Sequence, residues 1–198
     1  SAASDVYKRQ GQPRVLNIKE ILQEFIKHRK DVVTKRTKFD LRKAKDRGHI
    51  VEGLMVAIAN IDEVIKIIKK SKDTKIAATE LCKKSWKAGP IEAILKKAGK
   101  DACRPKGLSS DYGIKGKNYK LSPDQAKSIL ELRLGRLTGL EQDNLSSEFN
   151  EILDVILELQ KILDDKETLM KLIKDELIEV RENFGDDRKT NINDTRHD

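Results

Sequence analysis

The sequence predicts a mainly α-helical protein in which a long antiparallel two-helix coiled-coil arm carries a small, mostly helical globular module. Two long stretches repeat Leu and Ile at alternating spacings of three and four residues, which is the pattern of paired helices. The chain is 37% charged, 37% hydrophobic and only 4% aromatic, which favours long exposed helices over a large compact core. The two stretches also carry opposite net charge, so they are expected to pair with each other rather than each with itself.

The outgoing helix is predicted over residues 17–50. Asn17 with Glu20 three residues later is typical of a capping box at a helix start. This stretch contains 11 Lys and Arg against 5 Asp and Glu, so it is strongly basic. Its apolar stripe is incomplete and then strengthens after Gly48, which together with Gly53 permits a bend or a close helix approach. The apolar positions before that point are Ile18, Leu22, Phe25, Val32 and Phe39, with Arg29 and Arg36 interrupting them.

A small folded insert is predicted over residues 72–121. It contains two short helical patterns, at residues 74–84 and 90–97, followed by a Gly- and Pro-rich segment. Trp86 is the only tryptophan of the chain and is expected to be a hydrophobic anchor where the short helices meet. Tyr112 and Tyr119 flank two glycines, which suggests a loop or a ragged hairpin.

Residues 124–141, DQAKSILELRLGRLTGLE, form the most apolar short helical pattern. Ser122-Pro123 opens it with a cap residue and a proline at the first helical position, and Thr138-Gly139 interrupts it. Its apolar residues leave little polar circumference, so one stripe packs inward and another needs a partner. A contact surface is one interpretation, and a buried core helix is the other.

The return helix is predicted over residues 145–184, with a kink at Asp164-Asp165-Lys166 and an end at Gly185. Between residues 137 and 184 there are 5 Lys and Arg against 13 Asp and Glu, so this stretch is acidic. Its repeat is the clearest in the chain: Leu145, Phe149, Ile152, Ile156, Leu159 and Leu163, then Met170, Ile173, Leu177, Val180 and Phe184.

These elements predict the following organisation along the chain. It comprises a flexible start and entry segment (1–16), an outgoing helix (17–50), a globular module (51–144, insert 72–121), a returning and basal helix (145–184) and a linker or tail (185–198).

The sequence offers no recognisable catalytic or metal-binding constellation. It has no Gly-rich phosphate loop and no Ser/His/Asp set, and His28, His49 and His197 stand in unrelated contexts, where packing or surface roles are expected. Cys82 and Cys103 are too few for a disulfide framework or a metal cluster, which favours a reduced, cytoplasmic setting. No membrane-spanning run or signal peptide is apparent, so we expect a soluble protein with no membrane partner.

The basic outgoing helix is a candidate for phosphate contacts with DNA, although some of its cations must face the acidic return helix. The candidate DNA-facing residues are Lys35, Arg36, Arg42, Lys43 and Arg47.

Three segments resemble the coiled-coil and exit-gate part of the A subunit of bacterial DNA gyrase, a type IIA DNA topoisomerase. They are HRKDVVTKRTKFDLRKAKDRGHIVEGLMVAIANIDEVIKIIKKS (28–71), YKLSPDQAKSILELRLGRLTGLE (119–141) and IKDELIEVRENFGDDRKTNI (173–192). The resemblance spans residues 11–192. The insert, with Trp86 and Ala98-Gly99-Lys100-Asp101, is more similar to gyrase than to the corresponding part of topoisomerase IV.

The resemblance implies a homodimer that closes through an exit gate and opens to release a transported DNA duplex. It makes the small module a dimerisation module, serving ATP-dependent double-strand passage and negative supercoiling. The implied partners are a second copy, the gyrase B subunit in an A2B2 enzyme, and double-stranded DNA between the arms. The implied dimer-interface residues are Ala126, Ile129, Leu130, Arg133, Leu134, Leu137 and Leu140.

The resemblance implies no catalytic residue within this stretch. Tyr7, Tyr112 and Tyr119 match no motif of the family's DNA-cleaving tyrosine, so the chain alone is expected to be inactive. ATP and Mg²⁺ are expected to be used by the complete enzyme through its other subunit, with no cofactor or metal here. The alternatives are the equivalent part of the topoisomerase IV A subunit, a non-catalytic coiled-coil dimerisation module, or a DNA-binding module.

Overall fold

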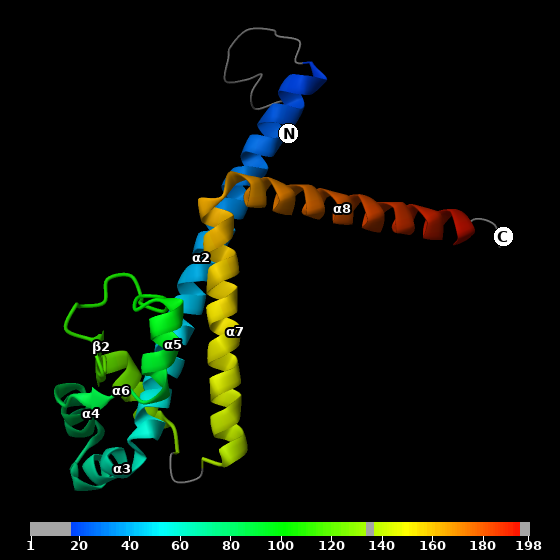
Figure 1. The fold of residues 1–198 in the computed structure, drawn as a ribbon. Helices are drawn as coiled ribbons and strands as arrows, with labels where there is room; N and C mark the ends of the chain where they lie inside the picture. The colour runs from blue at the N-terminus through cyan, green and yellow to red at the C-terminus, as the bar shows by residue number, and fades with distance from the viewer. Residues whose placement is uncertain (1–16, 134–136, 195–198) are drawn as a thin grey trace. The chain divides into compact units, whose positions relative to one another are not determined.

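The computed structural model describes residues 17–133 and 137–194, with side chains described as far as residue 185. It confirms the mainly α fold class, with one small sheet (Figure 1). The chain divides into two compact units. Unit 1 comprises residues 1–39 and 160–198, and unit 2 comprises residues 40–159. The predicted entry segment, residues 1–16, lies outside the described residues.

Helix α2 (Ile18–Ala59) is continuous and longer than the predicted outgoing helix, which was placed over residues 17–50. Its start is capped as expected, because the backbone N–H of Glu20 donates to Asn17 Oδ1 at 2.9 Å. Gly48 and Gly53 allow side chains of other elements to approach the backbone of α2 closely. A Cβ at Gly48 would lie 2.6 Å from Cys103 Sγ, and one at Gly53 would lie 2.7 Å from Gln125 Cγ.

Unit 2 contains a short-helix layer next to the second part of α2. Helix α3 (Ile61–Lys70) is followed by α4 (Thr74–Lys83) and α5 (Pro90–Ala98), close to the predicted bounds. Asp73 caps α4 by accepting the Ile76 N–H at 2.8 Å. Gly89 precedes α5 with φ +60, and a Cβ there would also meet Ala59 at 2.8 Å, so this turn requires glycine.

A three-stranded antiparallel sheet, in the order β1-β3-β2, joins these helices: β1 (Trp86–Lys87), β2 (Gly113–Lys115) and β3 (Asn118–Lys120). The hairpin expected around the glycines is therefore confirmed. Trp86 pairs with Tyr119 across the sheet, is almost fully buried, and donates its indole N–H to the Leu81 carbonyl at 2.9 Å. The core of unit 2 gathers on these residues and on Val51, Leu54, Val56, Leu81, Ile91, Leu95 and Leu121.

Helix α6 (Pro123–Glu131) and most of helix α7 (Gly139–Asp164), as far as Leu159, complete unit 2. Within this unit α7 lies alongside α2 (Figure 1), and Arg47 donates to both carboxylate oxygens of Glu148 at 2.7 and 3.2 Å. Helix α7 begins six residues before the predicted start at residue 145. The reason is a second capping box, in which Thr138 and Glu141 exchange side-chain to backbone hydrogen bonds.

Unit 1 packs helix α8 (Lys166–Asp194) against the first part of α2. The predicted break near residue 165 is confirmed, and Asp165 caps α8 by accepting from the Glu167 N–H and the Thr168 hydroxyl. Val33 and Ile173 are buried in this unit. The prediction that Gly185 ends the helix is wrong, because α8 continues to Asp194. An interior glycine costs only about 1 kcal/mol, and no proline follows it there.

Candidate dimer interface

The candidate contact surface begins on α6, whose start is fixed by local hydrogen bonds. The Ser122 hydroxyl accepts the Gln125 N–H at 3.3 Å, and the Gln125 side chain accepts the Ser122 N–H at 2.9 Å. Pro123 stands at the first helical position, where its missing N–H costs nothing. The helix ends at Glu131, and the following cap residue, Leu132, donates its N–H to the Ser128 carbonyl at 3.0 Å. This helix is shorter than the predicted pattern, which covers residues 124–141 with an interruption at Thr138-Gly139.

Helix α6 packs part of its apolar face against the chain's own core. Ala126 and Ile129 have no exposed surface, and Gln125 is buried beside them. Neither apolar residue can therefore present a side chain to a second copy in this conformation. We assign Ala126 and Ile129 to the core, and the helical period explains why, since both share a face with Ser122 and Gln125.

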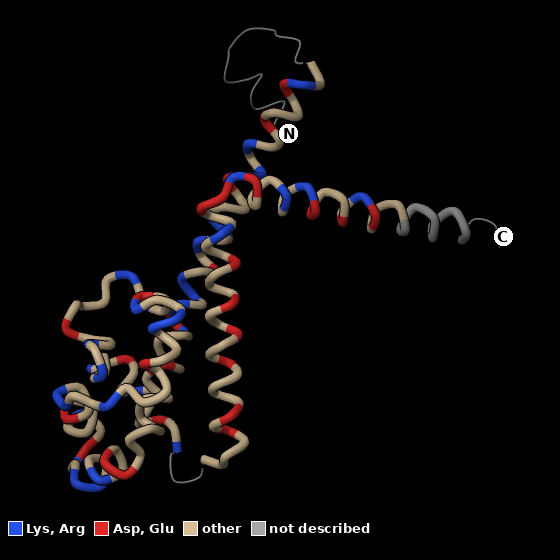
Figure 2. Tube along the Cα trace, in the orientation of Figure 1, with Lys and Arg blue, Asp and Glu red and all other residues tan. Residues whose placement is uncertain are grey.

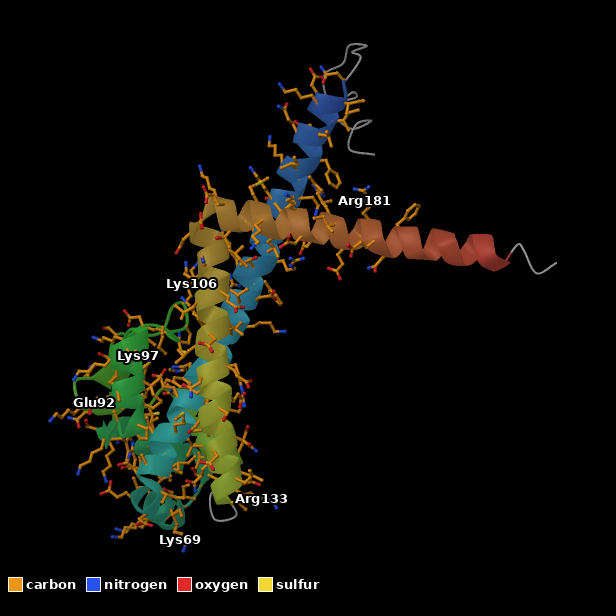
Figure 3. The ribbon with its side chains drawn as sticks, turned by 45° about the vertical axis from the view of Figure 1, so that its right-hand side comes forward. Lys69, Glu92, Lys97, Lys106, Arg133 and Arg181 are labelled. Carbon is orange, nitrogen blue, oxygen red and sulfur yellow. The ribbon has the colours of Figure 1, made fainter. Side chains whose placement is uncertain are left out.

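The other predicted interface residues that the structure describes keep accessible surface. Leu130 and Leu137 are half-buried, Arg133 is exposed, and Leu140 is 71% exposed at the start of α7. Leu134 lies outside the described residues. Figure 3 labels Arg133 at the end of unit 2 where α7 begins. We call Leu130, Arg133, Leu137 and Leu140 the gate surface.

A shallow groove adjoins the gate surface between α4 and α6. Its volume is about 510 Å³, and Ala78 and Leu130 give it an apolar wall. The other lining residues are Thr74, Lys75, Lys127 and Glu131, whose polar groups make a rim. Apolar contact area is thus continuous from Leu130 into the groove, which suits a partner side chain at the edge of a contact.

The predicted DNA-facing cations all lie on α2 and are all exposed. Arg36 pairs with Glu176 of α8, Arg47 pairs with Glu148 of α7, and Lys35 pairs with Asp31 at 3.1 Å. Hydrogen bonding to Glu148 raises the pKa of Arg47. Arg42 and Lys43 are also exposed on the basic helix. Figure 2 shows the contrast within unit 2 between acidic positions along α7 and basic positions along α2.

A buried polar cluster lies beneath the start of α6, which we call the Gln125 network: His49, Glu52, Tyr119, Ser122 and Gln125. His49 is 4% exposed and Glu52 is 6% exposed, and both belong to α2. Burial lowers the pKa of His49 to about 4 and raises that of Glu52 to about 7. Burial also raises the pKa of Tyr119 well above its ordinary value.

The sequence left His49 as either a packing or a surface residue, and the structure shows that it is buried; Glu52 and Gln125 were not singled out. The available signal was the Ser122-x-x-Gln125 spacing, which is a capping-box signature and implies a buried amide when apolar residues surround it. Tyr119 donates its hydroxyl to Glu52 Oε1 at 2.6 Å and has no exposed surface. Its oxygen is therefore enclosed by protein and cannot reach DNA.

Two negative findings apply to the part of the chain that the structure describes. Within it, no group of three or more His, Cys, Asp or Glu residues is placed to hold a metal ion. No helix among the described residues is long and apolar enough to cross a bilayer.

Comparison with known proteins gives one consistent result. Residues 2–178 match the family described as the A subunit of DNA gyrase/topoisomerase IV. The chain is 50% identical over 182 residues to the DNA gyrase A subunit of Pseudomonas aeruginosa, and the match covers 92% of this chain and 20% of that protein. Identity is 48% to the DNA gyrase A subunit of Haemophilus influenzae and 41% to that of Staphylococcus aureus strain MRSA252, each over 92% of this chain and over 20% and 17% of those proteins.

The chain therefore spans about a fifth of the length of the curated relatives that it matches. The match covers both units and includes the gate surface and the Gln125 network. The chain belongs to the family of DNA gyrase and topoisomerase IV A subunits.

Proposed function

We propose that this chain forms the exit gate of a DNA gyrase A subunit, where it holds two copies together and opens to release a transported duplex. The observation that carries the proposal is Leu140, which leaves 71% of its surface in water at the end of unit 2. Leu137 and Leu130 add half-buried apolar surface, and Arg133 adds a polar edge. An apolar patch with a polar rim is the usual anatomy of a contact between proteins.

A two-fold contact suits this patch because each residue is then used twice. Covering an exposed leucine contributes about 1.5–3 kcal/mol, so the two Leu140 side chains of a dimer would contribute about 3 kcal/mol or more. That amount changes a dissociation constant by about 100-fold. One well-covered leucine pair is therefore enough to make dimerisation measurably dependent on Leu140.

The proposed whole enzyme is a type II topoisomerase in an A2B2 assembly with the gyrase B subunit. We assign ATP and Mg²⁺ to that other subunit, and we place the complex in the cytoplasm. Gyrase is preferred over topoisomerase IV because the relatives reported above are all named as DNA gyrase A subunits. The transported duplex should face α2 rather than α7, because Arg42 and Lys43 attract phosphate whereas the carboxylates of α7 repel it.

The test is the mass of the purified chain by sedimentation equilibrium across a range of concentrations. The wild-type chain should dimerise, and Leu140→Asp should raise the dissociation constant at least 100-fold. The matched control is Leu157→Asp, also on α7 and 63% exposed, but well away from the gate surface in sequence. Equal weakening by both substitutions, or a wild-type chain that stays monomeric at every concentration, would refute the proposal.

A DNA-binding module is the second candidate, favoured by the basic surface of α2. Fluorescence anisotropy with a labelled duplex at several salt concentrations tests it, since phosphate contacts weaken steeply with salt. Tight binding by the dissociated Leu140→Asp variant would support this role in place of the gate. If the Leu140→Asp variant bound the duplex no more tightly than the Arg42→Ala variant does, that result would count against a DNA-binding role.

A further inference from the structure

Gln125 uses every polar atom of its side chain inside the protein. Its Nε2 donates to the His49 carbonyl at 2.7 Å and to the Tyr119 hydroxyl at 2.8 Å, while its Oε1 accepts the Ser122 N–H at 2.9 Å. The side chain has no exposed surface. Such a fully satisfied amide fixes direction as well as distance, because each hydrogen bond weakens when the geometry changes.

The Gln125 network extends from that amide to three elements. Tyr119 on β3 donates its hydroxyl to Glu52 on α2 at 2.6 Å, and His49 Nε2 lies 2.7 Å from the Ser122 hydroxyl. Helix α2, strand β3 and the start of α6 therefore share one continuous set of buried hydrogen bonds. Moving α6 along or around α2 would break several of them together.

The surface of α2 is shaped to receive this residue. Gly53 lies directly under Gln125, and a Cβ there would stand 2.7 Å from its Cγ and 2.8 Å from its Cβ. A larger side chain at residue 53 would push α6 away from α2. Gly53, which has no side chain, thus leaves on α2 the space that the Gln125 side chain of α6 occupies.

We propose that Gln125 is a positioning residue, which holds α6 at one place on α2 and thereby sets the position of Leu130 and Arg133 in the gate surface. The effect on the gate rests on the proposed exit-gate function, whereas the positioning of α6 on α2 does not. Leu130 follows Gln125 by five residues on the same short helix, a distance of about 7.5 Å at 1.5 Å per residue. A rotation at the start of α6 would therefore also move Leu130 in the gate surface.

The alternative explanation is that Gln125 only adds stability to the core. The two explanations differ in what an apolar replacement does. Leucine fills similar space but offers no directional contact, so Gln125→Leu should leave α6 folded yet in more than one position. An ordinary core truncation on the same helix, Ile129→Ala, should weaken packing while the hydrogen bonds still hold one position.

The experiment is ¹H–¹⁵N NMR of the whole chain, comparing the amide signals of residues 126–131. We expect doubled or strongly broadened signals in Gln125→Leu and a single set in Ile129→Ala. If Gln125→Leu does not fold, Tyr119→Phe decides, because it removes only the hydroxyl that Gln125 and Glu52 share. A single sharp set in the decisive variant would overturn the proposal.

Sedimentation equilibrium of the same variants then links position to the gate. Gln125→Leu, or Tyr119→Phe in its place, should raise the dimer dissociation constant at least tenfold more than Leu95→Ala on α5, compared at equal loss of stability. An equal effect would remove the link to the gate. A wild-type chain that never dimerises would refute the exit-gate proposal, while the NMR result would still decide whether Gln125 positions α6.

Discussion

His49 and Glu52 should give unit 2 two opposite pH dependences that cancel each other over a defined range. Burial raises the pKa of Glu52 to about 7, from 4.5 when the chain is unfolded. The folded state therefore binds the extra proton between pH 4.5 and 7, and its stability falls as pH rises through that range. Burial lowers the pKa of His49 from 6.5 to about 4, so there the unfolded state binds the extra proton and stability falls as pH falls.

The magnitude follows from the two shifts. Each is about 2.5 pKa units, and one unit corresponds to about 1.4 kcal/mol, so each group alone would change the free energy of unfolding by about 3 kcal/mol. Between pH 5 and 6.5 the titration ranges of Glu52 and His49 overlap. Their contributions to the slope of the free energy of unfolding against pH have equal size and opposite sign there. The contribution of this pair in the wild-type protein should therefore be nearly flat over that interval.

Removing one member of the pair should reveal the slope of the other. Glu52→Gln leaves His49, so unit 2 should lose about 2 kcal/mol of stability as pH falls from 6.5 to 5. His49→Gln leaves Glu52, so unit 2 should lose about 2 kcal/mol as pH rises from 5 to 6.5. The double substitution should restore a nearly flat profile and also provides the background from all other titrating groups.

Urea unfolding followed by Trp86 fluorescence is the suitable assay, since the only tryptophan is buried in unit 2. Absolute stabilities of the variants will differ because hydrogen bonds are altered, but the slope against pH is independent of that offset. Slopes of the same sign in both single variants would refute the conclusion that burial changes the pKa values of His49 and Glu52 in opposite directions. So would flat profiles in both, which would mean that neither group is perturbed by burial.

Two further predictions concern one residue in each unit. Glu176→Gln should weaken the contact of α8 with α2 by about 1 kcal/mol, because two arginines donate hydrogen bonds to this partly exposed carboxylate. The weaker contact should appear as faster amide hydrogen exchange over residues 166–185, and unchanged exchange would contradict the prediction. Although partial burial raises the pKa of Glu176, hydrogen bonds from both arginines outweigh it and lower the pKa, so this contribution is lost below the unfolded value of 4.5 as the carboxylate protonates. Gly53→Ala should destabilise unit 2 by about 2 kcal/mol in tryptophan-monitored urea unfolding, despite a better helix propensity, because its Cβ would overlap Gln125. Gly139→Ala, where nothing lies within 4 Å, is the control, and equal effects of the two substitutions would contradict the close fit.

The sequence predicted the helices well because their signals are local and repeated. The repeats and the cap residues located the start of α2, the bounds of α4 and α5 and the break before α8 to within a few residues, whereas α2 extends nine residues past its predicted end. The exceptions were also local in origin. Helix α7 starts early because Thr138 and Glu141 form a capping box, and α8 passes Gly185 because one glycine alone does not end a helix.

The candidate site was harder to predict because it depends on tertiary contacts. Periodicity showed that α6 is apolar on more than one side, but it could not say which side faces α2. The structure turns Ala126 and Ile129 inward and leaves Leu130 near the surface. The difference of one residue between positions 129 and 130 is about 100° around a helix, and the orientation depends on tertiary contacts such as the close fit of Gln125 on Gly53.

If the gate surface is the proposed exit-gate contact, which must open, the Gln125 network and the small apolar patch have complementary roles in it. A gate held by extensive apolar area would close too firmly, since each added 1.4 kcal/mol makes the open state about tenfold rarer. A small patch has the opposite weakness, because a slight misplacement of one leucine removes much of its contact. In the proposed dimer, directional hydrogen bonds inside each copy would correct that weakness without adding any attraction between the two copies. The Gln125 network would thus make a weak contact accurate, so that precision comes from the core of unit 2 and reversibility from the modest size of the gate surface.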